Sequence, residues 1–164
     1  VELYLNGKSL GVQQKTDSTY HVSWRVPFTP GTLRAVSRLG GKEVLVKEIH
    51  TAGEPARLVL TPHRSVIQAD GSDLSFVTVD VCDIDRNRVP DATPLIRFFV
   101  EGPGEIAGTD NGDPNDPNSL RKPKRQAYYG KALVVIRNKG GQGDIHLKAI
   151  AEGLPEATVT IQAQ

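Results

Sequence analysis

Short runs of alternating apolar and polar residues, each ended by Gly or Pro, recur along the entire chain. The 16 Gly and 11 Pro residues are scattered as turn signals and are not gathered in low-complexity stretches. No window shows apolar residues at helical spacing over three turns. This pattern predicts an all-β protein made of many short strands joined by tight turns.

The N-terminal third predicts strands on both sides of strong turn signals. Asn6-Gly7 is a typical two-residue hairpin turn. Further along, Tyr20, Val22, Trp24 and Val26 alternate with polar residues, which predicts a strand with one buried face. The expected strands are Glu2–Leu5, Lys8–Val12, Tyr20–Val26, Leu33–Arg38 and Glu43–His50.

The segment Thr51–Pro55 contains Gly and Pro and interrupts the strand pattern, so we interpret it as a domain junction. The expected domains are residues 1–51 and residues 55–164. About 50 residues are marginal for an independent core, and Val1 already lies at the start of a strand. We therefore expect the first domain to be a small β-sandwich, truncated at its N-terminus. The chain contains no Met, so we expect it to be a piece of a longer polypeptide.

The second domain predicts about seven strands, which is typical of an immunoglobulin-like or fibronectin-like β-sandwich. Cys82 is the single cysteine, so packing alone must hold the two sheets together. Val77, Val79 and Val81 are expected to share the buried face of one strand. A short edge piece is expected at Ser65–Gln68, and the seven expected strands are Arg57–Thr61, Ser75–Cys82, Ile96–Glu101, Glu105–Gly108, Ala132–Arg137, Asp144–Ala151 and Ala157–Gln162.

Charge and hydropathy exclude several classes of partner. Lys and Arg number 20 against 19 Asp and Glu, so the near-neutral chain gives no case for nucleic acid. No segment approaches the roughly 18 apolar residues that a membrane-spanning helix needs. A cysteine-type zinc site is excluded, because one thiol cannot supply two sulfur ligands. We expect no cofactor.

The most polar loop contains Asp110, Asp113 and Asp116. Three carboxylates at this spacing could bind calcium. Asp, Asn, Gly and Pro are also the residues that form turns, and we favour a cluster of turns. Asp83–Arg88 resembles the start of a calcium loop, but Arg88 occupies the position that needs Gly, so we expect a hairpin there.

Two further features have both a functional and a structural interpretation. Trp24 could stack on a sugar, although its place among alternating apolar residues favours a core position. The basic run Arg121–Arg125 lies near Tyr128 and Tyr129 and could meet an acidic partner, but we favour a solvated loop. No carboxylate lies in a recognisable catalytic motif, and the strand context of Cys82 indicates a small buried residue.

Val1–Gly11, with the sequence VELYLNGKSLG, resembles a hairpin in the C-terminal region of bacterial glycoside hydrolase family 2 enzymes of the β-galactosidase type. The resemblance implies that the chain is an accessory tail, with part of one sandwich and a complete second one. The catalytic glutamates of that family lie in an upstream barrel, so the resemblance assigns no catalytic residue here. Other segments that resemble the family are Tyr20–Pro27, Pro30–Val36, Thr51–Ala56, Ala69–Val79, Asp110–Pro114 and Gly130–Val135.

The resemblance therefore predicts a non-catalytic structural module of a glycoside hydrolase. It would pack against the upstream catalytic domain of the same polypeptide or against a second subunit. The alternatives are a carbohydrate-binding module and an adhesin stalk of tandem sandwiches. Aromatic residues make up only 5% of the chain and mostly lie at alternating strand positions, which favours the structural module. The resemblance also implies a periplasmic or extracellular location.

Overall fold

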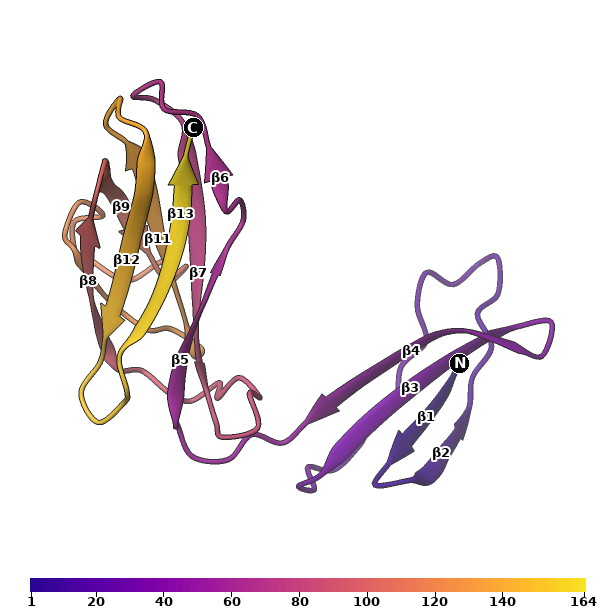
Figure 1. Cartoon of the computed structure of the whole chain (residues 1–164). Helices are drawn as coiled ribbons and strands as arrows, with labels where there is room; N and C mark the ends of the chain where they lie inside the picture. The colour runs from indigo at the N-terminus through magenta and orange to yellow at the C-terminus, as the bar shows by residue number, and fades with distance from the viewer. The chain divides into compact units, whose positions relative to one another are not determined.

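The computed structural model describes residues 1–164, and all of its regular elements are β-strands (Figure 1). The all-β prediction is confirmed. The chain divides into two compact units, Val1–Thr51 and Ala52–Gln164. No helix with the length and apolar character needed to cross a membrane is present.

The first unit contains one antiparallel sheet with the strand order β2-β1-β3-β4. Asn6 and Gly7 both have positive φ values, 50° and 80°, as a two-residue hairpin turn requires. Leu3 and Val36 are the buried apolar side chains of this unit, so its core is small. The strands are β1 Glu2–Leu5, β2 Lys8–Val12, β3 Thr32–Leu39 and β4 Lys42–His50.

The strand predicted over Tyr20–Val26 is wrong, because no strand forms between β2 and β3. Trp24 is half-buried and does not belong to the fully buried core that its alternation predicted, and Tyr20 is 97% exposed. A strand needs a neighbouring backbone to pair with, and here a side chain takes that role. The Gln13 amide donates to Ser23 O over 2.6 Å, and Ser23 N donates to Gln13 Oε1 over 3.3 Å.

The second unit is a two-layer β-sandwich (Figure 1). One layer is a four-stranded sheet in the order β5-β7-β11-β9, made of β5 Arg57–Pro62, β7 Leu74–Cys82, β11 Lys131–Asn138 and β9 Gly104–Asp110. The other is a five-stranded sheet in the order β10-β8-β12-β13-β6, made of β10 Lys124–Gln126, β8 Leu95–Glu101, β12 Gly143–Ile150, β13 Ala157–Ala163 and β6 Val66–Ile67.

Alternation places one face of each sheet in a shared apolar core. In β7, the side chains of Val77, Val79 and Val81 are fully buried, as predicted, whereas Phe76 on the opposite face is 44% exposed. Cys82 is buried and free, so no disulfide joins the sheets. Other fully buried core residues are Ile96, Val134, Ile136, Ile145, Leu147 and Ile161.

The short strand β6 pairs in parallel with β13, whereas the other strand pairs are antiparallel. In the register, Val66 lies opposite Gln162 and Ile67 lies opposite Ala163. The pairing ties the segment after β5 to the last strand of the unit.

Candidate functional site

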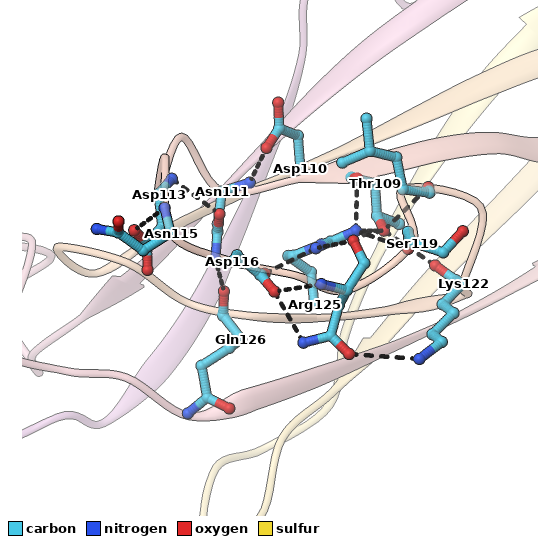
Figure 2. A network of polar contacts seen from close by, with 12 residues as sticks. Thr109, Asp110, Asn111, Asp113, Asn115, Asp116, Ser119, Lys122, Arg125 and Gln126 are labelled. Atoms are coloured by element: carbon cyan, nitrogen blue, oxygen red, sulfur yellow. Dashed lines mark hydrogen bonds and ion pairs between the residues drawn. The ribbon is translucent and has the colours of Figure 1, made fainter.

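The polar loop between β9 and β10 is organised around a buried arginine (Figure 2). Arg125 is the middle residue of β10 and is only 2% exposed, whereas its neighbours Lys124 and Gln126 are exposed. Because side chains alternate across a strand, Arg125 points to the core side while Lys124 and Gln126 point outward. A buried guanidinium requires acceptors for its donors and an opposite charge nearby.

The loop supplies both the charge and the acceptors. Arg125 Nη1 donates to Asp116 Oδ2 over 2.7 Å, which forms an ion pair with little exposure to solvent. Nη2 donates to Thr109 O and to Ser119 O, each over 3.0 Å. Nη1 also reaches Asn118 O over 3.4 Å, and Nε reaches Thr109 Oγ1 over 3.3 Å. The guanidinium therefore fixes β9 and the middle of the loop to β10.

The three aspartates proposed as metal ligands make separate local contacts. Asp110 Oδ1 accepts from Asn111 N over 2.7 Å, and Asp113 Oδ1 accepts from Asn115 N over 2.9 Å. Asp116 pairs with Arg125 instead. No group of three His, Cys, Asp or Glu side chains is placed to hold a metal ion. These contacts favour the interpretation of the loop as a cluster of turns.

The ionisation of Asp116 follows from its contacts. The backbone N–H of Asn118 and the Arg125 guanidinium stabilise the carboxylate and lower the pKa of Asp116 to about 2, from an ordinary value of 3.8. At neutral pH the side chain is therefore ionised and acts as an acceptor.

The expectation of a solvated basic loop over Arg121–Arg125 needs correction. Arg121, Lys122 and Lys124 are exposed, but Arg125 is buried and lies in a strand. The sequence did not predict β10 because the strand has only three residues, and all three are charged or polar. The burial of Arg125 could have been inferred from the alternation of side chains along a strand, together with the carboxylate and hydroxyl acceptors nearby in the sequence.

A second carboxylate organises the start of the sandwich. Asp83 is buried, and its Oδ2 accepts from Gly53 N over 2.8 Å, while its Oδ1 accepts from Asn87 N over 2.8 Å and Asp85 N over 3.0 Å. The hydrogen bond from Gly53, followed by those from Asn87, lowers the pKa of Asp83. The predicted hairpin is therefore present, and its first residue also holds the junction segment.

The groups with a clear pKa shift include a thiol and several carboxyls. Burial raises the pKa of the Cys82 thiol, which keeps it protonated and poorly nucleophilic. The carboxyl groups with a clear shift all have a lowered pKa, whereas glycoside hydrolysis requires one carboxyl with a raised pKa. These carboxyl groups are Glu2, Asp70, Asp73, Asp83 and Asp116.

An open apolar hollow of about 440 Å³ lies on the outward side of β5 and β7. The His63 and Phe76 rings meet edge to face, with centroids 6.5 Å apart. The hollow contains no carboxylate. Its lining residues are Thr61, Pro62, His63, Phe76 and Thr78.

Comparison with known proteins gives two family matches and several long relatives. Residues 58–160 match the glycoside hydrolase family 2 C-terminal domain 5, and residues 1–45 match a domain of unknown function, DUF4982. The chain is 51% identical over 164 residues to the β-galactosidase BoGH2A of Bacteroides ovatus, covering 100% of this chain and 19% of that protein. It is 30% identical over 141 residues to a β-glucuronidase assigned in Formosa agariphila, covering 84% of this chain and 14% of that protein.

Solved structures are also similar to this chain over a small part of their own length. A glycosyl hydrolase family 2 member from Bacteroides cellulosilyticus superposes with a TM-score of 0.91 at 36% identity, over 99% of this chain and 21% of that chain. A β-glycosidase from Bacteroides vulgatus superposes with a TM-score of 0.92 at 27% identity, over 98% of this chain and 21% of that chain. The chain therefore spans between 14% and 21% of the length of these four proteins.

Proposed function

The chain belongs to the glycoside hydrolase family 2 C-terminal domain 5 family, and from this membership we propose that it is a non-catalytic structural module of a longer glycoside hydrolase. The predicted resemblance to the C-terminal region of family 2 glycoside hydrolases is confirmed by the match over residues 58–160 and by the similarity of the entire chain to the B. ovatus β-galactosidase, whereas the Val1–Gly11 hairpin lies within the match to DUF4982. The module would pack against the upstream catalytic domain of the same polypeptide or against another subunit.

The observation that carries the proposal is the use of the carboxylates. Asp83 and Asp116 accept hydrogen bonds from the chain around them, and both have a lowered pKa. A general acid for glycoside cleavage would need the opposite shift and a second carboxyl across a cleft. These side chains hold loops in place, which supports a structural role.

The longer protein is proposed to be of the β-galactosidase type. This proposal rests on the 51% identity to the B. ovatus β-galactosidase over the entire chain. We also propose that the longer protein is periplasmic or extracellular, and this proposal rests on the family resemblance alone.

The test uses the longer enzyme with and without this chain, assayed on a chromogenic β-galactoside and on a polymeric galactan. Without the chain, we expect a lower Tm and a lower yield, with similar kcat and KM on both substrates for the protein that remains folded. The isolated chain should give no turnover. Turnover that follows this chain through purification, or an unchanged Tm and yield after its removal, would contradict the proposal.

The second candidate is a carbohydrate-binding module, favoured by the exposed Phe76 ring in the hollow described above. Under this alternative, removal of the chain would raise KM for the polymer and leave KM for the chromogenic substrate unchanged. Trp24 is the other candidate for sugar stacking, although its half-buried position leaves less of the ring accessible.

A further inference from the structure

The outward face of the five-stranded sheet carries three cations around an exposed aromatic ring. Lys124 of β10 lies opposite Arg97 of β8, and Lys148 of β12 lies opposite Phe99 of β8. Phe99 is 47% exposed, and Lys148 Nζ lies 5.8 Å from its ring centroid. Because Arg97 and Phe99 are two residues apart on one strand, all four side chains share one face. These four residues are called the cationic patch below.

Acidic side chains of the protein do not neutralise the centre of the cationic patch. Neither Arg97 nor Lys124 forms an ion pair, and Lys148 approaches a carboxylate only at 3.9 Å, that of Glu156. Like charges directly opposite each other on neighbouring strands are destabilising. The pair Arg97 and Lys124 therefore costs stability without contributing to the core, which is typical of residues that serve binding.

The size and shape of the patch favour an extended polyanion. Strand spacing and rise place its three cations within about 12 Å of flat sheet surface. On the same face, Glu101 follows Phe99 by two residues and lies opposite His146, and Asp144 lies further along β12. These acids limit the positive area. A standard protein interface covers about 800 Å² per partner and would have to include them.

We propose that the cationic patch binds an acidic polysaccharide that carries carboxylates. Arg97 and Lys124 pair with the carboxylates, and the guanidinium of Arg97 can do so with two parallel hydrogen bonds. Phe99 offers an apolar surface to the C–H groups of a sugar ring, next to the charge of Lys148. The exposed Thr158, which lies opposite Lys148, adds a hydroxyl on the same face.

Isothermal titration of the full chain with an oligogalacturonide and with a neutral galactan oligosaccharide of the same length tests the proposal. We expect saturable binding of the oligogalacturonide, at least about tenfold tighter than binding of the neutral oligosaccharide. The R97Q/K124Q variant should lose about tenfold in affinity. Its Tm should be unchanged or higher, because the like-charge pair is gone. The matched control K15Q/K139Q removes two exposed cations outside the patch and should leave the affinity within about twofold.

Three results would overturn the proposal. The first is the absence of oligogalacturonide binding, or equal binding of the neutral oligosaccharide. The second is an equal loss of affinity in R97Q/K124Q and K15Q/K139Q, which would indicate attraction by net charge alone. The third is binding of poly-glutamate as tight as that of the oligogalacturonide, together with no effect of Phe99→Ala on either, which would indicate an acidic protein as the partner.

Discussion

Arg125 and Asp116 form an ion pair of 2.7 Å, in which the arginine side chain is 1% and the aspartate side chain 9% exposed. The two residues are nine positions apart, so the pair closes the loop between β9 and β10 on itself. Breaking such a pair leaves a buried charge without a partner, which costs more than the intact pair contributes.

Replacing Arg125 should therefore destabilise the sandwich. In Arg125→Gln, the acceptors at Thr109, Asp116 and Ser119 lose their donor, and we expect a loss of about 3 kcal/mol in the free energy of unfolding. Urea denaturation of the parent and the variant measures this loss. The neighbouring exposed Lys124→Gln is the control and should stay within about 0.5 kcal/mol of the parent. Similar urea midpoints for the two variants would contradict the structural role of Arg125.

Acid should weaken the same pair. The pKa of Asp116 is about 2 in the folded chain, below its ordinary value of 3.8. A group with a lowered folded pKa contributes stability that is complete above its unfolded pKa and is lost as pH falls through its folded pKa. The Tm should therefore decrease between about pH 4 and pH 2, and Asp116→Asn should show a smaller decrease in this window. Equal slopes for parent and variant would exclude Asp116 as a source of the acid sensitivity.

Asp83 should hold the segment that leads into the sandwich. In Asp83→Ala, the backbone N–H groups of Gly53, Asp85 and Asn87 lose their acceptor. We expect the Tm to fall by roughly 5 °C and amide exchange at Gly53 to accelerate. Asp85→Ala, at the exposed turn of the same hairpin, is the control. Unchanged exchange at Gly53 would show that Asp83 does not anchor it.

Two glycines should respond differently to alanine. Gly130 has φ +69°, and a Cβ there would lie 2.3 Å from Val89 O, whereas Gly112 has φ +77° with no atom within 4 Å of a Cβ. Gly112→Ala should lower the free energy of unfolding by only about 1 kcal/mol, the cost of the left-handed backbone conformation for a residue with a Cβ. Gly130→Ala must also displace the backbone at Val89, so its Tm should fall well below that of Gly112→Ala. Equal melting temperatures would contradict the close approach.

A chelator should leave the Tm unchanged, because Asp110 and Asp113 each make their own local hydrogen bond through Oδ1, and Asp116 pairs with Arg125. Thermal melts with EDTA and with added calcium test this expectation. A metal that binds the folded chain raises its Tm. A higher Tm in calcium that is lost in Asp110→Asn would therefore establish a metal site in this loop.

Alternation was enough to predict the strands of the sandwich except the three-residue β10. In β7, the three valines face the core because the strand has partners on both sides, β5 and β11, and both of its faces are defined. Tyr20–Val26 has the same alternation but no strand beside it, so the pattern produced a half-buried Trp24 without a strand. Pairing depends on distant segments, which a local pattern does not contain.

The role of Arg125 could not be predicted from its charge. In the sequence it is one of several neighbouring cations, but in the structure only Arg125 turns inward to meet Asp116. The partners of a buried charge are fixed by the tertiary fold. The sequence therefore predicted the turns of this loop and missed the residue that holds them together.

The parallel pair β6 and β13 has a mechanical consequence. Tension along the chain would pull β6 toward its N-terminal end and β13 toward its C-terminal end, which are opposite directions for parallel strands. The hydrogen bonds from Gln162 N to Ser65 O, from Gln164 N to Ile67 O and from Ala69 N to Gln164 O would then be sheared together. They would break at once and not one after another, so the sandwich should resist stretching until this short clamp ruptures.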